Sequence, residues 1–310
     1  MFFFPFRVDI PLGRWPFITL LIALICILVF NHQINSDGRL KQALHSFCQQ
    51  QQYNDDLNIV LSKLKSHQIQ SCEGLFLAIH NNNGNKDFIQ QLARIAQPIA
   101  GFNRNDKQEY ISTTLNSSYQ ILNTDIPDNL SEKLAYKPAS FNPVTMITSQ
   151  FAHADIYHIA GNLLFFFAFA ASLEIVLGIM SFTAIVLSLS IAVSLAYSFS
   201  NLGNAQALAT IGLSGVVMGM IGLFTYLMPA AKIRCLFIFL LYFRIFLIPA
   251  WLLALIYIGS DFYYLFIAKI ETSVNLVAHV SGGISGYLIG MIFFKKKKAI
   301  INKHIHKINH

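Results

Sequence analysis

The sequence predicts an all-α integral membrane protein, with six membrane-spanning helices and a mostly helical extramembrane insertion between the first and the second of them. Of the 310 residues, 55% are hydrophobic and only 12% are charged. A soluble domain is nearer to a quarter charged. The apolar residues gather in six runs of roughly membrane-spanning length, and one polar stretch separates the first run from the other five.

The first apolar run covers residues 15–30 and follows Arg7 and Arg14. No small-residue cleavage site comes after it, so we expect a retained helix rather than a cleaved signal peptide. Crossing the hydrocarbon takes about 20 residues, and this helix must therefore extend into its flanks. We predict that residues 1–31 are a cytoplasmic N-terminus and the first membrane helix.

Residues 32–150 differ sharply in composition, being rich in Asn, Gln, Ser and charged residues. Apolar residues recur at helical spacing in 57–64 and 88–99, which predicts amphipathic helices. We expect a small inserted domain here that is mostly helical. Its two cysteines, Cys48 and Cys72, would pair in an oxidising compartment, and the sequence leaves the paired and the free state equally open.

The five remaining apolar runs form a predicted helical core over residues 151–294. The stretch 232–244, between the fourth and fifth helices, is apolar but carries three basic residues. Because an arginine at the bilayer centre is costly, we expect an interfacial loop there. The five runs are roughly 153–173, 179–199, 210–228, 246–264 and 274–294.

Basic residues gather at the N-terminus, in 232–244 and in the tail, 295–310. Six spans place these three clusters on one side of the membrane, which the positive-inside rule assigns to the cytoplasm. Residues 32–150 then lie outside. Since the clusters adjoin apolar runs, we expect the lipid bilayer, and no nucleic acid, as the partner of the net charge of +7. The compact length and the absence of a targeting extension favour a bacterial inner membrane.

Helix parity brings polar residues to one depth, because the second, fourth and sixth helices all enter from the outer face. His153, His158 and Asn162 fall in the first turns of the second helix. Ser214 and His279 fall about four and five residues into the fourth and sixth helices, on the order of 6–8 Å below their starts. Such groups are costly in hydrocarbon and normally face a cavity or one another. We therefore expect a water-accessible site just below the outer surface.

Glycines frame both Ser214 and His279. Small residues at helical spacing let two helices approach closely, which a serine on one helix needs to reach a histidine on another. The imidazole would take the hydroxyl proton as Ser214 attacks a carbonyl. The framing glycines on the two segments are Gly212, Gly215, Gly282 and Gly286.

Three groups are candidates to stabilise the resulting oxyanion, namely the Ser214 backbone N–H, the Asn162 amide and the His158 ring. The sequence places no Asp or Glu clearly beside His279. We therefore expect a catalytic dyad rather than a triad.

At these residues the sequence resembles the rhomboid family of intramembrane serine proteases. The resemblance covers helices two to six, about residues 151–294. It rests on Gly-x-Ser-Gly at 212–215, on His-x4-His-x3-Asn at 153–162, on His279 with its two downstream glycines, and on Glu174 followed by Gly178. We expect Glu174 to cap or bridge helices near the cytoplasmic end of the second helix.

The resemblance implies a six-helix rhomboid-like bundle that cleaves single-span membrane proteins at small residues in unstable helices, without metal or cofactor. It also implies Ser214 and His279 as the dyad, His158 and Asn162 as oxyanion donors, and His153 as a supporting residue. One departure is Met218, because many members carry a tyrosine four residues after the serine that stacks on the histidine. A thioether packs on a ring as well, but the orientation of the histidine is then less assured.

Two other functions compete with proteolysis. A zinc site built from His153, His158 and His279 would lack the His-Glu-x-x-His pairing of zinc hydrolases. A catalytically inactive rhomboid-like protein that binds membrane helices, or a transporter, is the other alternative. We see no internal repeat of the kind many transporters have, and both the serine and the histidine are present, so the enzyme is favoured.

Overall fold

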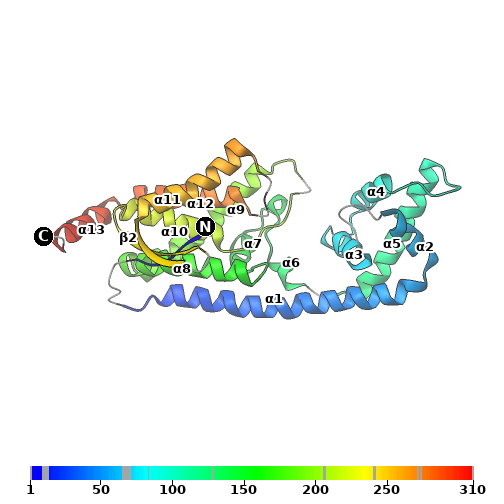
Figure 1. Ribbon diagram of the computed structural model, residues 1–310, viewed down its shortest axis with the longest axis horizontal. Helices are drawn as coiled ribbons and strands as arrows, with labels where there is room; N and C mark the ends of the chain where they lie inside the picture. Colours follow the sequence, from blue (N-terminus) through cyan, green and yellow to red (C-terminus); the bar gives the residue numbers. More distant parts are fainter. Residues whose placement is uncertain are drawn as a thin grey trace. The chain divides into compact units, whose positions relative to one another are not determined.

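The computed structural model describes residues 2–8, 14–64, 71–82, 84–127, 129–204, 207–239, 242–270, 272 and 274–308. The chain divides into two compact units (Figure 1). The first, here called the membrane unit, comprises Met1–Asn31 and Leu134–His310. The second, the inserted unit, comprises His32–Lys133.

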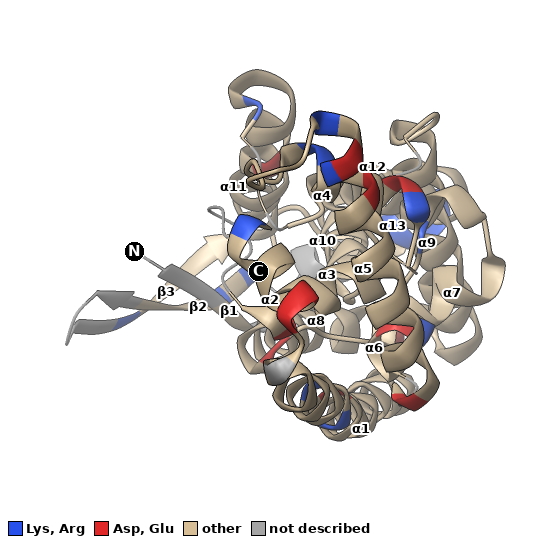
Figure 2. Cartoon of the chain, turned by 90° about the vertical axis from the view of Figure 1, so that its right-hand side faces the viewer, with Lys and Arg blue, Asp and Glu red and all other residues tan. Residues whose placement is uncertain are grey.

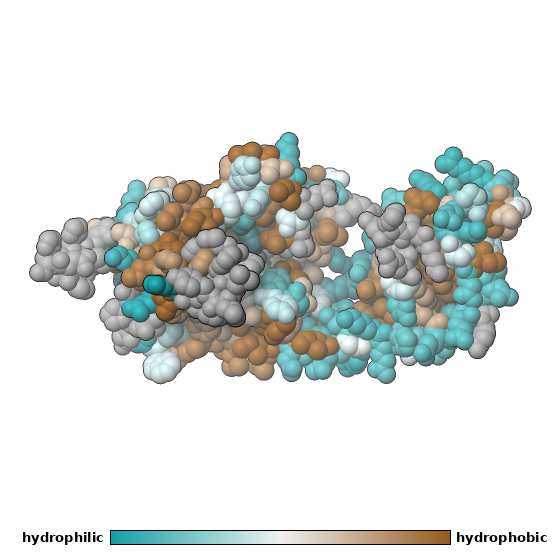
Figure 3. Space-filling view, in the orientation of Figure 1, coloured by the Kyte–Doolittle hydropathy of each residue, from teal (hydrophilic) through white to brown (hydrophobic). Residues whose placement is uncertain are grey.

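Five helical segments of the described residues are long and apolar enough to cross a membrane. On the face shown in Figure 3, hydrophobic residues gather over the helices of the membrane unit, whereas the surface of the inserted unit is largely hydrophilic. This pattern confirms the predicted bundle of apolar helices. The segments are α1 (Phe17–Gln50), α8 (Ile156–Leu177), α9 (Ile179–Ser200), α11 (Ala250–Phe262) with the π-helical turn Tyr263–Ala268, and α12 (Leu276–Phe293).

The fourth of the six predicted spans, 210–228, corresponds to a shorter helix, α10 (Ser214–Leu227). Twelve of its fourteen residues are buried. A helix that is apolar all round belongs in a core, where other helices rather than lipid surround it. Phe224 of α10, for example, meets Phe169 of α8 edge to face with ring centroids 5.5 Å apart. The helix that begins with Ser214 is therefore the centre of the membrane unit.

A three-stranded antiparallel sheet lies beside these helices (Figure 2). It is formed by β1 (Phe2–Val8), β2 (Lys232–Phe239) and β3 (Tyr242–Pro249), in that order. The prediction of a loop at 232–244 is therefore wrong, since the described residues of this stretch belong to β2 and the beginning of β3. In β2, Ile233 and Cys235 are buried while Lys232 is exposed. This period of two is that of a strand with one face covered, and the loop prediction overlooked it.

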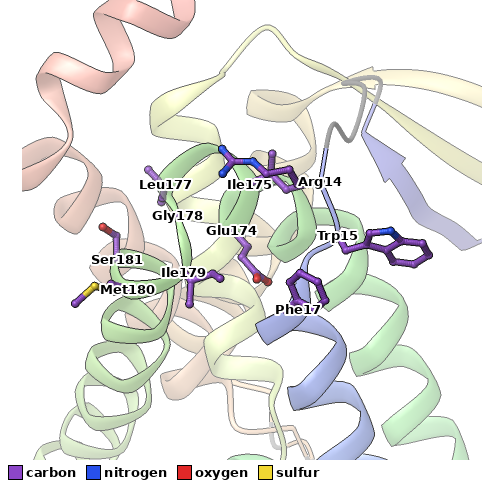
Figure 4. A pocket seen from close by; sticks show the side chains of 10 residues that line it. All are labelled: Arg14, Trp15, Phe17, Glu174, Ile175, Leu177, Gly178, Ile179, Met180 and Ser181. Carbon is purple, nitrogen blue, oxygen red and sulfur yellow. The ribbon is translucent and has the colours of Figure 1, made fainter.

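Glu174 holds the beginning of α1 against the end of α8. Its carboxylate is buried, with 3% of the residue exposed, and accepts three hydrogen bonds. These come from the backbone N–H groups of Ile18 (2.8 Å) and Thr19 (2.7 Å) and from the Thr19 hydroxyl (2.7 Å). A carboxylate at a helix N-terminus satisfies N–H groups that have no partner within the helix. The expected capping role is confirmed. Figure 4 shows the carboxylate directed at the first turn of α1, beside a pocket of about 610 Å³.

The inserted unit is helical, as predicted, and has its own apolar core. It contains a disulfide bond between Cys48 and Cys72, which resolves the alternative left open by the sequence. Besides the second half of α1, its helices are α2 (Asp55–Leu64), α3 (Cys72–Asn81), α4 (Lys86–Ile95), α5 (Arg104–Asp125) and α6 (Leu130–Leu134), the last of which ends at the boundary.

The boundary between the units lies at Lys133 and not at the predicted residue 150. Residues 134–150, including the short helix α7 (Pro143–Thr148), belong to the membrane unit because their polar groups bond to it. The backbone of Tyr136 exchanges two 2.9 Å hydrogen bonds with Thr210, and its hydroxyl bonds to Ser198. The predicted tail forms the helix α13 (Lys295–Ile308), and residues 309 and 310 lie outside the described residues.

We expect Glu174→Ala to lower the free energy of unfolding by about 3 kcal/mol, since three buried donors lose their acceptor. Thr19→Val removes only one of the three bonds and should cost about 1 kcal/mol. Both values follow from equilibrium unfolding of the full chain in mixed micelles, monitored by circular dichroism. Equal stability of Glu174→Ala and the wild type would contradict the capping role.

Candidate active site

Ser214 is the first residue of α10, reached through a turn that requires glycine. Gly212 has φ +117°, a region that side chains with a Cβ rarely adopt, and its N–H donates to the Ser149 carbonyl at 2.8 Å. The predicted position four residues inside the helix is therefore wrong, because this turn delays the helix start. As a result the Ser214 N–H is one of the helix's first N–H groups, which have no intrahelical acceptor.

His158 and Asn162 converge on this turn from α8. A Cβ built on Gly212 would lie 2.6 Å from His158 Nε2 and 3.5 Å from Asn162 Nδ2. The Ala154 N–H donates to His158 Nδ1 at 3.4 Å, so the ring proton belongs on Nε2. Asn162 is 8% exposed, and its Nδ2 has no partner among the described residues. Two donors thus meet next to the turn that leads into Ser214.

His279 is the fourth residue of α12 and is 8% exposed. Its Nδ1 lies 2.7 Å from Asp261 Oδ2, while its Nε2 is buried with no partner among the described residues. A carboxylate only accepts, so the proton is on Nδ1 and Nε2 carries a lone pair. No hydrogen bond joins Ser214 to His279 in the part of the chain that the structure describes.

Asp261 was missed in the sequence analysis, which expected no carboxylate beside His279. It lies on α11, 18 positions before the histidine, and the helical spacings that exposed the other site residues do not connect the two. One signal was present. An acidic side chain inside the apolar run 246–264 is costly in a membrane and marks a candidate functional residue.

The framing glycines bring the backbones of α10 and α12 into direct contact, as expected. A Cβ on Gly282 would lie 2.1 Å from the Gly215 carbonyl oxygen, and one on Gly286 would lie 1.8 Å from that of Gly219. Neither distance leaves room for a side chain. The beginning of α10, at Ser214, is therefore held against the first turns of α12, which carry His279.

A small cavity of about 20 Å³ lies beside Ser214. That volume admits about one water molecule. Asn275 and Thr210, two residues that the sequence analysis did not single out, lie in its wall. Asn275 caps α12 by accepting from the Ala278 N–H at 3.0 Å and also donates to the Thr210 hydroxyl at 3.2 Å. This pair ties the segment before α10 to the segment before α12.

His153 lies in the connection before α8, not inside the helix as predicted. It is 1% exposed, and its ring stands almost perpendicular to that of His158 at 5.2 Å. Burial, followed by the neighbouring His158, lowers the pKa of His153 to about 4, so the ring is neutral at physiological pH. Met218 is buried in the core one turn after Ser214. Among the described residues, no group of three or more His, Cys, Asp and Glu side chains is arranged to hold a metal ion.

Comparison with known proteins identifies the family. The family model of the rhomboid domain matches residues 141–296, about half of the chain, and includes every site residue above. The chain belongs to the rhomboid family. It is therefore an integral multi-pass membrane protein. Rhomboid protein 1, mitochondrial, from Saccharomyces cerevisiae is 34% identical over 98 residues, which cover 31% of this rhomboid and 28% of the yeast protein.

We expect Gly286→Ala to destabilise this rhomboid by about 3 kcal/mol, since the added methyl group collides with backbone that cannot move aside. Gly161→Ala is the matched control on α8, where a Cβ would meet nothing within 4 Å. That control should be neutral or slightly stabilising. Thermal unfolding in detergent measures both, and equal melting temperatures would refute the close contact.

Proposed function

We propose that this rhomboid is a serine-type intramembrane endopeptidase with Ser214 as nucleophile and His279 as base. The observation that carries the proposal is the state of His279. Its Nδ1 is held by a carboxylate, and its buried Nε2 has no partner among the described residues, although a buried polar atom normally has one. An imidazole with a free lone pair, on a helix in backbone contact with the serine helix, suits a general base.

In the proposed reaction His279 Nε2 takes the hydroxyl proton as Ser214 Oγ attacks the scissile carbonyl carbon. The oxyanion accepts hydrogen bonds from the Ser214 N–H, His158 Nε2 and Asn162 Nδ2. His279 then returns the proton to the leaving amine, which departs and leaves an acyl-enzyme. A water molecule deprotonated by His279 hydrolyses the ester, and the 20 Å³ cavity beside Ser214 is a place from which this water could come.

We propose single-span membrane proteins as substrates, cut near the outer membrane face. Ser214 and His279 lie in the first turns of their helices, so the reacting groups are close to one membrane surface. The carbonyl of a helical residue is already hydrogen-bonded and shielded by side chains. A substrate must therefore unwind locally before attack, which favours helices with small residues near that surface.

The proposed topology places both termini in the cytoplasm and the inserted unit outside. The first turns of α8, α10 and α12 share one side, and the basic segments 232–244 and 295–310 share the other. The Cys48–Cys72 disulfide supports an oxidising compartment for the inserted unit. A bacterial inner membrane is the location we propose.

Ser214→Ala and His279→Ala should each lower kcat for a model single-span substrate by at least about 10³-fold, because nucleophile and base act as one unit. Cleavage by the purified full chain in liposomes is the measurement, with labelling of Ser214 by a fluorophosphonate as a second readout. Ser190→Ala is the matched control, since among the described residues that buried hydroxyl bonds only to the Val186 carbonyl of its own helix, at 2.9 Å. Undiminished cleavage by both variants would reject the protease. Binding of the substrate without cleavage by the wild type would instead indicate an inactive helix-binding protein.

The topology predicts that Cys72→Ser exposes a Cys48 thiol on the outer face. We expect a membrane-impermeant maleimide to label this variant in intact cells, and the wild type only after reduction. Cys26 and Cys235 are buried and should not react under native conditions. A Cys235→Ser variant controls for background. If the maleimide labels Cys72→Ser only after the cells are opened, the inserted unit lies on the cytoplasmic side and the proposed topology is wrong.

A further inference from the structure

Asp261 is an unusual residue for its surroundings. It is the one charged residue in α11, and the neighbouring Phe262 and Tyr263 are 46% and 50% exposed. The Asp261 side chain is only 16% exposed. A carboxylate in a membrane helix is costly unless it is paired. Its position therefore needs an explanation beyond packing.

The contact with His279 is built into the interface between α11 and α12. Ile258 lies three residues before Asp261, on the same face of α11, and packs on Gly283, where a Cβ would lie 2.6 Å from Ile258 Cδ1. Gly283 lies four residues after His279, on the same face of α12. Two neighbouring pairs, Ile258 with Gly283 and Asp261 with His279, thus fix one register between the helices. At 2.7 Å the polar pair is a short, charge-assisted hydrogen bond.

We propose that Asp261 is a positioning residue that makes the predicted dyad work as a triad. This inference rests on the proposed protease function. By accepting the Nδ1–H of His279, Asp261 selects the tautomer whose Nε2 can take a proton from Ser214, and it holds the ring in the plane of that bond.

Asp261 also balances the charge that the reaction creates. When His279 accepts the proton, a cation forms in a site with little water. Among the described titratable groups, His158 of α8 interacts electrostatically with His279, and His153 packs on His158. Neither of these imidazoles offers a negative charge. Asp261 is the anion that turns an isolated imidazolium into an ion pair.

The test is the kinetics of Asp261→Asn in the full-length protein in liposomes. An asparagine keeps the size of the side chain but bonds either tautomer and carries no charge. We expect kcat to fall about 10²-fold or more and KM to stay within about twofold. The kcat of Asp261→Glu should be at least about tenfold higher than that of Asp261→Asn. Ser260→Ala is the matched control, because in the described part of the chain its hydroxyl bonds only to the Tyr257 carbonyl of its own helix, at 3.0 Å.

Two further readouts separate positioning from a structural role. In ¹⁵N spectra of histidine-labelled protein, the His279 signal, assigned by its loss in His279→Ala, should report the Nδ1-protonated tautomer in the wild type and a mixture in Asp261→Asn. In a His279→Ala background, Asp261→Asn should change residual activity less than twofold. A wild-type kcat for Asp261→Asn, or an unchanged tautomer, would overturn the inference. If Ser214→Ala and His279→Ala lose at least about 10³-fold in kcat in the same assay, the protease proposal survives that outcome.

Discussion

The close contact between the α10 and α12 backbones is the constraint on which the rest of the membrane unit depends. The carbonyls of Gly215 and Gly219 lie where side chains on Gly282 and Gly286 would otherwise be. Contact at this distance leaves α10 surrounded by protein and allows it to be short. It also fixes the register between the two helices, and with it the positions of Ser214 and His279 relative to each other. Van der Waals contact of this kind is what drives helix association where the hydrophobic effect is absent.

The polar groups around this contact fall into two classes. Glu174 and Asp261 are both matched to specific donors, at the beginning of α1 and on the ring of His279. By contrast, Asn162 Nδ2 and His279 Nε2 are buried without partners among the described residues. Buried polar atoms are nearly always satisfied, and two open ones on the helices next to Ser214 fit the roles proposed for them in catalysis. The same hydrogen-bonding requirement thus explains the paired carboxylates and supports the proposed site.

The sequence predicted most of this architecture, because apolar length and charge distribution are direct consequences of the bilayer. The spans follow from them, while the helical insertion and the glycine-mediated contact follow from the helical spacing of apolar and of small residues. The start of α10 was misplaced because the turn at Gly212 is set by the Ser149 carbonyl, a tertiary contact. The β2–β3 hairpin was missed because the three basic residues of 232–244 drew attention to the membrane surface, and the period of two in β2 was overlooked. Asp261 was missed because depth was compared only for the helices that enter from the outer face, whereas Asp261 lies three residues before the outer end of the run 246–264.

The pairing of Glu174 with the first turn of α1 has a consequence for biosynthesis. The donor and the acceptor are 156 positions apart in the chain. When α1 enters the membrane during synthesis, the ribosome has not yet made Glu174, whose carboxylate caps the first turn of α1. Until α8 is made, the first turn of α1 must therefore lie near the polar headgroups, where water satisfies its N–H groups. Docking of α8 then removes that water, so the order of synthesis becomes an order of assembly.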